Sequence, residues 1–254
     1  MMRLNYLVKI RIILTLAAIL LLIAVVFFGV KSGQNPDKLW QIVSQQCLPN
    51  MRENHNPAPC QSVDLAKGYV LFKDKVGVVQ YLLMPTSKIS GIESPLLQSP
   101  DTPNYFAEAW SERGIMSVKH GAPIADQHIA LAINSVSGRS QNQLHIHLSC
   151  IRTDVAAQLA QHSPTINSQW QPLSLHGHLY QVRALSLPQL VQQSVFIRLA
   201  DEVPDARQHM GYFGMALSAL PDGRLVLLAV ERDRLKGNFA SAEELQDHQC
   251  QILN

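Results

Sequence analysis

The sequence predicts an α+β domain built on an antiparallel sheet, preceded by one membrane-spanning helix. Short apolar segments of strand length recur along the 254-residue chain, separated by turn-forming residues. Helical segments are interspersed among them, and the short turns between neighbouring strands leave no room for the crossovers that parallel strands need. An uncharged apolar run lies near the N-terminus, and the remaining length allows one large domain or two small ones.

The apolar run extends from Ile12 to Val30, between Arg11 and Lys31, and its nineteen residues carry no charge. As a helix it would be about 28 Å long at ~1.5 Å per residue, which matches the ~30 Å hydrocarbon core of a bilayer. Positive residues precede it, so the positive-inside rule places the N-terminus in the cytoplasm and the rest of the chain on the far side. We therefore expect residues 1–31 to be a cytoplasmic N-terminus and an uncleaved signal anchor, and residues 32–254 to form one exported domain.

A cleaved signal peptide is the alternative for this segment. Its apolar region would normally be shorter, and the tripeptide Phe28-Gly29-Val30 is a poor cleavage site. A lipoprotein signal is not expected either, because the first cysteine is Cys47. A mature N-terminus mapped to about residue 31 would contradict the signal-anchor interpretation.

Four cysteines lie in the exported part, and an even number in an oxidising compartment predicts two disulfides. Three pairings are possible. We favour Cys47 with Cys60, because these two bracket a short proline-rich loop, which leaves Cys150 to pair with Cys250. The sequence lacks the CxxC spacing of structural zinc sites.

The other elements follow from local signals along the chain. Proline at a first turn and a polar residue before it indicate where helices begin, and glycine indicates where they end. Ser241 with Glu244 three residues later has the spacing of a capping box. In chain order we expect a helix from Pro36 toward Cys47, a hairpin of Gly68–Phe72 and Val76–Met84, a loop over 88–103, a helix from Thr102 to Gly121, a strand over Ile129–Ser135, the strand 143–149, a short helix capped by Asp154, strands over His178–Leu185, Tyr212–Ala219 and Leu225–Val230, helices opened by Pro188 and Pro204, and a final helix from Ser241 to about Ile252.

The segment 143–149 alternates strictly between polar and apolar residues. Such alternation is typical of a strand with one buried face, so its three apolar residues would point into a core. The polar residues, which include His145 and His147, would lie side by side on the other face. Two imidazoles directed to one place suit either a metal or a nucleophile with a helper.

The metal interpretation is the weaker of the two. A third ligand is needed, and the positions where a cupin-like pattern has a glutamate hold Ile151 and Arg152. A second pair, His176 and His178, flanks a glycine that indicates a turn. By contrast, neutral imidazole is a good nucleophile near pH 7, because its pKa of about 6.5 leaves most of it unprotonated. The preceding turn, residues 138–142, offers donors for phosphate oxygens.

The histidine strand resembles the motif His-φ-His-φ-His-φ-φ of the histidine-triad superfamily. From about residue 37 to the end, the wider sequence is similar to CDP-diacylglycerol pyrophosphatase. The segments that carry this similarity are QQCLPN at 45–50, NPAPC at 56–60, QYLLMPT at 80–86, ESPLL at 93–97, LAINS at 131–135, GR at 138–139, QN at 141–142, CIR at 150–152, EVP at 202–204, HMG at 209–211, SAEE at 241–244 and DHQC at 247–250.

The resemblance implies an α+β, HIT-like antiparallel sheet with flanking helices. It also implies hydrolysis of CDP-diacylglycerol to CMP and phosphatidate through a covalent nucleotidyl-histidine. His145 would match the nucleophile that attacks the cytidine-side phosphorus, and His147 the third histidine, which contacts the bridging oxygen. The substrate-binding residues implied in this way are Asn134, Ser140, Gln141 and Gln143.

The expected partners are the lipid substrate and the membrane. The chain would be a single-pass protein of the cell inner membrane, with residues 32–254 as a periplasmic hydrolase domain. A net charge of +2 without a basic stripe predicts no nucleic-acid partner. We expect no metal, no cofactor and no obligate protein partner.

One departure from the motif leaves alternatives open. The first motif histidine is Gln143 here; a Gln amide donates and accepts as a neutral His does, but it cannot carry a positive charge. We expect activity to persist. The alternatives are a hydrolase or transferase of soluble nucleotides and a catalytically impaired lipid-binding homologue.

Simpler roles are packing for His145 and His147, and turn or strand-end contacts for the substrate-binding set. His248 is expected to be solvated or to cap a helix.

Overall fold

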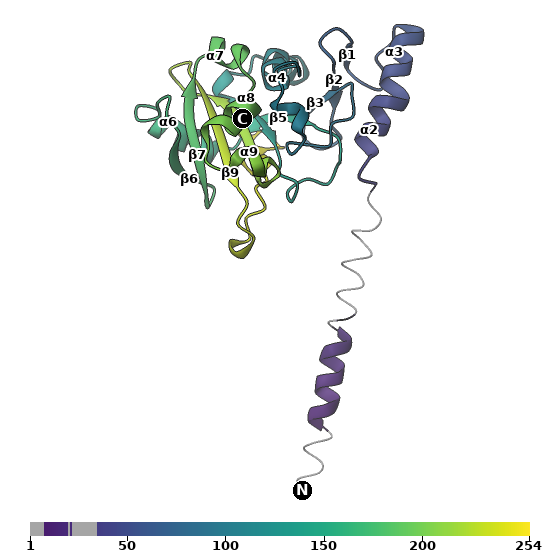
Figure 1. The fold of residues 1–254 in the computed structure, drawn as a ribbon, viewed down its shortest axis with the longest axis vertical. Coiled ribbons are helices and arrows are strands. Elements are labelled where there is room, and N and C mark those ends of the chain that lie inside the picture. Colours follow the sequence, from purple (N-terminus) through teal and green to yellow (C-terminus); the bar gives the residue numbers. More distant parts are fainter. Residues whose placement is uncertain (1–7, 20, 22–34) are drawn as a thin grey trace. The chain divides into compact units, whose positions relative to one another are not determined.

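The computed structural model describes residues 8–19, 21 and 35–254 (Figure 1). It divides into two compact units, residues 1–36 and 37–254, and residues 8–19 of the first are helical. Among the described residues, none of the helices has both the length and the apolar character needed to cross a bilayer. Most of the predicted span Ile12–Val30, and the predicted boundary at 31/32, fall outside the described residues, so the signal anchor stays a prediction.

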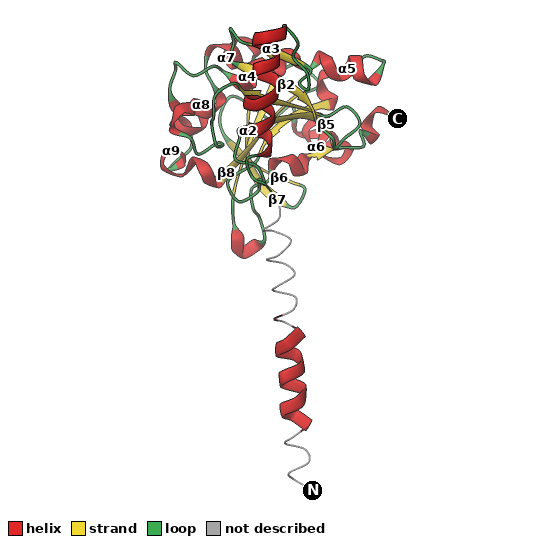
Figure 2. Cartoon of the chain, turned by 90° about the vertical axis from the view of Figure 1, so that its right-hand side faces the viewer, coloured by secondary structure: helices red, strands yellow, loops and turns green. Residues whose placement is uncertain are grey.

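Within the described residues, ten antiparallel strands form one sheet in the order β1-β2-β3-β5-β4-β8-β9-β7-β6, and the short β10 pairs with β5. Figure 2 shows the strands in yellow, with helices in red around them. The predicted α+β class with an antiparallel sheet is therefore confirmed. The strands are β1 (Ser62–Asp64), β2 (Tyr69–Lys73), β3 (Tyr81–Pro85), β4 (Ile129–Ile133), β5 (Ile146–Ile151), β6 (Gln171–Leu175), β7 (His178–Leu185), β8 (Phe213–Ala219), β9 (Leu225–Glu231) and β10 (Gln246–Asp247).

The helices cover both faces of the sheet. One face carries a single large apolar core beneath α4, α5, α7 and α8, and the opposite face carries two smaller ones. Of these two, one lies under α6 and the C-terminal segment, and the other lies under α2 and α3. The helices are α2 (Lys38–Ile42), α3 (Leu48–Asn54), α4 (Tyr105–Glu112), α5 (Gly114–His120), α6 (Thr153–His162), α7 (Leu187–Gln192), α8 (Val195–Glu202) and α9 (Ala206–His209).

The expected helix from Thr102 to Gly121 is two helices, α4 and α5, which meet at Arg113. The N-cap is Asn104 rather than Thr102, because the Asn104 side chain accepts from the backbone N–H of Ala107. Gly121, at φ +83°, closes the second helix as predicted.

The expected final helix from Ser241 is wrong. This segment holds a 3₁₀ turn (Ala242–Leu245), β10 and a second 3₁₀ turn (Gln251–Leu253). A capping box requires both side chains to return to the backbone at the helix start. Here the Ser241 hydroxyl donates to Asn134, and the Glu244 carboxylate accepts from His178 and Tyr180. Both side chains are therefore used in tertiary hydrogen bonds and do not cap a helix.

Both predicted disulfides are confirmed. Cys47 is bonded to Cys60 and Cys150 to Cys250, with sequence separations of 13 and 100 residues. The second bond ties the C-terminal segment to the histidine strand, because Cys150 lies in β5.

Removal of the long-range disulfide is expected to destabilise the domain more than removal of the short one. In the chain-entropy picture, the loop closed by Cys150 and Cys250 contributes ~4.7 kcal/mol and the loop closed by Cys47 and Cys60 roughly 3 kcal/mol. The double variants Cys150→Ser/Cys250→Ser and Cys47→Ser/Cys60→Ser can be compared by denaturant unfolding. The reverse order of stabilities would contradict the loop-length argument.

Candidate active site

The two motif histidines lie on the sheet face that holds the two smaller cores. Leu144, Ile146 and Leu148 point into the large core on the opposite face, as the alternation predicts. His145 and His147 are 7% and 6% exposed, and their ring centroids are 4.9 Å apart. The predicted imidazole pair is therefore present and almost fully buried.

The His145 ring is held through one nitrogen. Its Nδ1 lies 2.6 Å from the backbone carbonyl oxygen of Gln143. A carbonyl only accepts hydrogen bonds, so Nδ1 carries the proton and Nε2 keeps its lone pair. Burial lowers the pKa of His145 to about 4, and the neighbouring His147 adds to this shift. The ring is thus a neutral base near pH 7, with its free electron pair on Nε2.

The His147 ring has two contacts at Nδ1, and Nε2 has no hydrogen-bond partner among the described residues. Nδ1 lies 3.3 Å from the Gln80 amide nitrogen and 3.3 Å from a carboxylate oxygen of Glu243. In the neutral ring, donation from Gln80 leaves the proton on Nε2; in the charged ring, Nδ1–H faces the carboxylate. Nε2 is therefore a donor in both states, and in the part of the chain that the structure describes it is buried without a partner. Burial lowers the pKa of His147, while Glu243 opposes this shift.

Glu243 and His248 complete the site, and the sequence analysis missed both. His248 Nε2 lies 3.2 Å from the Glu243 carboxylate, and the Asn134 amide donates to that carboxylate at 3.0 Å. Burial opposes ionisation of Glu243, but the hydrogen bond from His248 and the charge of His147 outweigh it and lower the pKa to about 2. Glu243 in turn raises the pKa of His248. The His248 side chain keeps part of the predicted solvent exposure, at 30%, and it pairs with Glu243 rather than with a helix end.

No local pattern marks these two residues as functional. They reach the histidines because β10 pairs with β5 and Cys250 is bonded to Cys150. The available signal was the family resemblance of the segments 241–244 and 247–250, but neither segment contains a feature that indicates a contact with His147.

The predicted substrate-binding residues take different places. Asn134 holds the Glu243 segment, since its side-chain oxygen accepts from the Ser241 hydroxyl and the Glu243 backbone N–H, both at 3.1 Å. Gln141 accepts from the backbone N–H of Leu39 at 3.1 Å, which ties the turn to α2. Ser140 is exposed at the surface of the same turn. Their contacts to substrate stay predictions.

Gln143 acts on the site through its backbone. Its side chain is fully buried, and its amide donates to the carbonyls of Pro85 at 3.1 Å and Ser87 at 3.0 Å. Its own carbonyl holds His145. Both side-chain hydrogens are therefore used to fix the loop after β3, and the nucleophile candidate depends on the main chain at this position.

Gln143→His is expected to lower stability by about 1 kcal/mol and to leave kcat within a few-fold. A neutral imidazole has one N–H, so one of the two carbonyls would lose its donor, whereas the backbone contact to His145 remains. Thermal unfolding and CMP release together check this. A drop in kcat of a hundredfold with unchanged stability would show that the side chain itself takes part in the chemistry.

A fixed cation lies near the pair. The Arg139 guanidinium donates to both Glu93 carboxylate oxygens, at 2.6 and 2.7 Å, and the Ser90 hydroxyl donates to the same carboxylate. Arg139 is close enough for its charge to contribute to the lowered pKa of His145. Both terminal nitrogens of Arg139 are therefore occupied by Glu93, and the carboxylate offsets the guanidinium charge.

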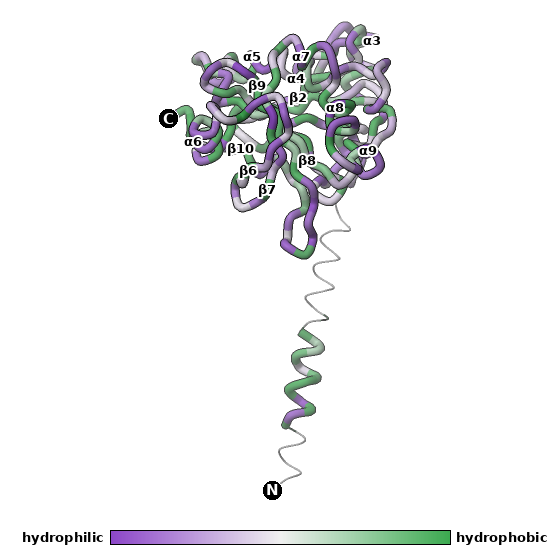
Figure 3. The backbone as a smooth tube through the Cα atoms, turned by 60° about the vertical axis from the view of Figure 1, so that its left-hand side comes forward, coloured by the Kyte–Doolittle hydropathy of each residue, from purple (hydrophilic) through white to green (hydrophobic). Residues whose placement is uncertain are grey.

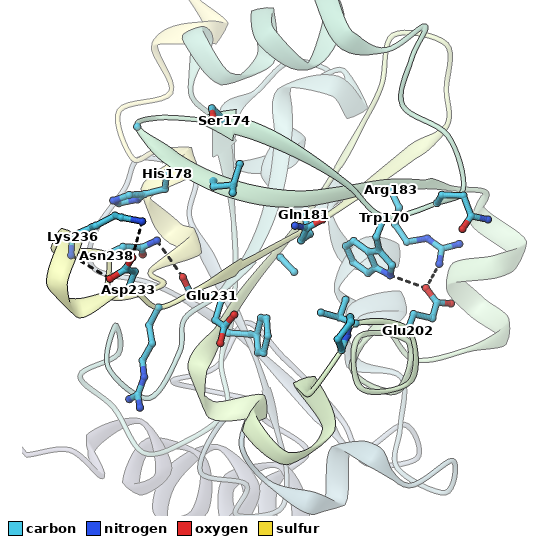
Figure 4. A pocket seen from close by; sticks show the side chains of 18 of the residues that line it. Trp170, Ser174, His178, Gln181, Arg183, Glu202, Glu231, Asp233, Lys236 and Asn238 are labelled. Carbon is cyan, nitrogen blue, oxygen red and sulfur yellow. Dashed lines mark hydrogen bonds and ion pairs between the residues drawn. The ribbon is translucent and has the colours of Figure 1, made fainter.

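Hollows on the domain include one beside the histidine site and one away from it. One, of about 380 Å³, is lined by Glu243 and His248 and so borders the histidine site. The larger, of about 1550 Å³, is lined by residues of β6, β7 and β9, and Figure 4 shows Trp170 and Arg183 both directed at Glu202 there. None of the residues in this larger hollow belongs to the histidine site. In the described residues, no group of three or more His, Cys, Asp and Glu side chains is arranged to hold a metal ion.

An antiparallel α+β domain with a neutral imidazole beside a second imidazole that keeps a buried donor has features of a hydrolase that acts on phosphate esters or anhydrides. The chain matches the model of the CDP-diacylglycerol pyrophosphatase family over residues 34–254. It belongs to this family, and it is accordingly a hydrolase of the CDP-diacylglycerol pyrophosphatase kind.

Proposed function

We propose that the chain hydrolyses CDP-diacylglycerol through a covalent cytidylyl-His145 intermediate. The observation that carries this proposal is the hydrogen bond from His145 Nδ1 to the Gln143 carbonyl, which leaves the electron pair on Nε2. The lowered pKa of His145, about 4, keeps this atom unprotonated at neutral pH. A buried imidazole with this tautomer needs no separate base to act as a nucleophile.

The reaction proceeds in two displacements. His145 Nε2 attacks the cytidine-side phosphorus, the bond from that phosphorus to the bridging oxygen breaks, and phosphatidate leaves with the electron pair. His147 Nε2–H donates to the bridging oxygen, which gives this buried donor its partner. Water then attacks the same phosphorus, the bond to Nε2 breaks, CMP departs, and the water proton passes to solvent.

A relationship to the histidine-triad superfamily is part of the proposal. It is supported by the spacing of the two histidines, since His147 lies in β5 of the antiparallel sheet and His145 comes directly before that strand. In this relationship Gln143 replaces the first histidine, and its backbone carbonyl supplies the contact that orients the nucleophile. We also propose that the chain is anchored in the inner membrane with residues 32–254 in the periplasm, since the lipid substrate would then remain in the bilayer beside the domain.

The test uses CDP-diacylglycerol labelled in the cytidine-side phosphate and a rapid quench. We expect an acid-labile, alkali-stable label on the protein that disappears in His145→Ala. Hydrolysis in water enriched in the heavy oxygen isotope should place the isotope in CMP. An isotope found in phosphatidate would show attack at the lipid-side phosphorus and would refute the proposed route. Comparison of CDP-lipid with soluble dinucleotides tests the alternative substrate class.

Glu243→Gln is expected to reduce kcat on the order of tenfold while KM changes little. The carboxylate acts through His147: it keeps Nδ1 protonated in the charged ring, and the amide removes that charge. The measurements are steady-state CMP release and the His147 pKa by NMR, which should fall in the variant. The matched control is Glu244→Gln, because Glu244 is the next residue and contacts His178 and Tyr180 instead. An unchanged His147 pKa would reduce Glu243 to a structural residue.

A further inference from the structure

A short hairpin, residues 231–239, projects from the domain between β9 and the 3₁₀ turn at Ala242; we name it the tip hairpin. It is the yellow-green loop at the lower edge of the domain in Figure 1, and Figure 3 shows an apolar tip between hydrophilic flanks. Leu235 is fully exposed at its tip, and Phe239 is 50% exposed at its base. Fully exposed large apolar residues at the end of a projecting loop have no packing role in the domain that carries them.

The tip hairpin has a fixed shape. The backbone groups of Asp233 and Asn238 exchange two hydrogen bonds of 2.9 Å, and Gly237 adopts the left-handed conformation that the turn requires. The Asp233 carboxylate accepts from the backbone N–H of Lys236 and pairs with its ammonium group at 3.0 Å. The hairpin therefore holds Leu235 in a fixed position. Binding of Leu235 to another surface would not carry the entropic cost of ordering a flexible loop.

Cations flank the apolar tip. Arg234 and Lys236 are the neighbours of Leu235 and both are exposed. Arg232 lies over the Tyr212 ring at 3.5 Å, farther from the tip. An apolar side chain between two cations suits the boundary of a bilayer, where the apolar group enters the acyl region and the cations meet anionic headgroups.

The base of the tip hairpin is connected to the active site. Arg232 and Arg234 donate to the Ser137 hydroxyl at 3.2 and 3.1 Å, and the Ser135 hydroxyl donates to the Phe239 carbonyl at 2.6 Å. Ser135 and Ser137 belong to the segment that links Asn134 to the turn before the histidine strand. A surface that meets the tip hairpin is therefore next to the loop that leads to His145.

We propose that the tip hairpin docks the domain on a bilayer that contains anionic phospholipid, with Leu235 in the acyl region and Arg234 and Lys236 at the headgroups. The family acts on a diacylglycerol lipid, which resides in such a surface. The inference rests on the lipid substrate and not on the chemistry proposed for His145. It adds a second contact with the membrane beside the predicted N-terminal anchor.

The test places one environment-sensitive fluorophore on the full chain. All four native cysteines are in disulfides, so Leu235→Cys supplies a single free thiol for labelling. The matched control is Val118→Cys on α5, which is 76% exposed and lies on the other side of the domain in Figures 2 and 3. Both labelled proteins are mixed with vesicles of phosphatidylcholine with or without phosphatidylglycerol, some carrying a lipid-bound quencher in the acyl region.

We expect the label at 235 to shift to shorter wavelength and to lose at least half of its emission to the quencher in vesicles with phosphatidylglycerol, while the label at 118 stays unchanged. High salt should weaken the effect, because headgroup contacts are screened. Equal behaviour of the two labels would overturn the proposal. So would shielding of position 235 without quenching, which would indicate a protein partner. The readout requires no turnover, so a failure of the His145 mechanism leaves it intact.

An activity arm uses Leu235→Asp in the full chain. Turnover of long-chain substrate in vesicles is expected to fall at least fivefold, while turnover of a short-chain, water-soluble CDP-diacylglycerol stays within twofold. Equal loss on both substrates would show damage to the domain rather than to docking, and no loss on either would contradict the inference.

Discussion

His145→Ala is expected to lower CMP release from CDP-diacylglycerol by roughly four orders of magnitude or more, because removal of the proposed nucleophile leaves only binding and electrostatic effects. The loss should lie in kcat. The native enzyme should lose kcat/KM toward acid with a midpoint near pH 4 rather than 6.5, since the protonated ring has no free pair and the pKa of His145 is about 4. Purified full-length protein and a pH series check both statements.

Chemical rescue makes this prediction specific. In His145→Gly, added imidazole can occupy the vacated space and attack the cytidine-side phosphorus. The bond to the bridging oxygen then breaks, so release of phosphatidate, together with cytidine 5′-phosphorimidazolide, should increase with imidazole concentration. His120→Ala is a matched control, because His120 is exposed at the end of α5. Substantial turnover in His145→Ala, in a protein that is folded by circular dichroism, would contradict the proposed nucleophile.

His147→Ala is expected to lower kcat by about 10²- to 10⁴-fold, the usual contribution of a positioned proton donor. The size of the loss should depend on the leaving group. The p-nitrophenyl ester of cytidine 5′-phosphate has a leaving group, p-nitrophenolate, that departs without a proton. The variant should therefore hydrolyse this ester almost as fast as the native enzyme does. Steady-state rates on the two substrates provide the measurement.

A second variant separates the proton-donor role of His147 from a packing role. His147→Asn keeps a buried polar side chain of similar shape and removes the Nε2 donor at the ring position, so it should show the same leaving-group dependence as His147→Ala. A loss of equal size on both substrates would show that His147 supports the structure of the site and does not donate to the bridging oxygen.

The antiparallel sheet and the histidine pair were predictable because they depend on local patterns. Alternation over 143–149 sets which residues face the large core, and the pairing of β4, β5 and β8 then leaves His145 and His147 on the opposite face. The disulfide of Cys47 with Cys60 was predictable for a similar reason, since a short loop brings its ends together at little entropic cost.

The C-terminal segment was mispredicted because its conformation depends on distant partners. Ser241 and Glu244 have capping-box spacing, yet Asn134, His178 and Tyr180 provide better-placed hydrogen-bond partners. The contribution of Glu243 to the site arises from the same tertiary contacts, since Asn134 binds both its backbone and its carboxylate.

From the sequence alone, the class of the fold, the two disulfides, the imidazole pair and the family resemblance followed, because spacing along one strand and similarity along the chain are properties of the sequence itself. Tertiary structure alone decided that the Gln143 carbonyl sets the tautomer of His145. It also decided that Glu243 contacts both His147 and His248. The pairing of Arg139 with Glu93 near the two histidines is a further contact of this kind. Two of these contacts join distant parts of the chain: His147 and Glu243 are 96 positions apart, and Arg139 and Glu93 are 46 apart. No local pattern encodes such a separation, because burial and pairing of the whole sheet must first bring the segments together.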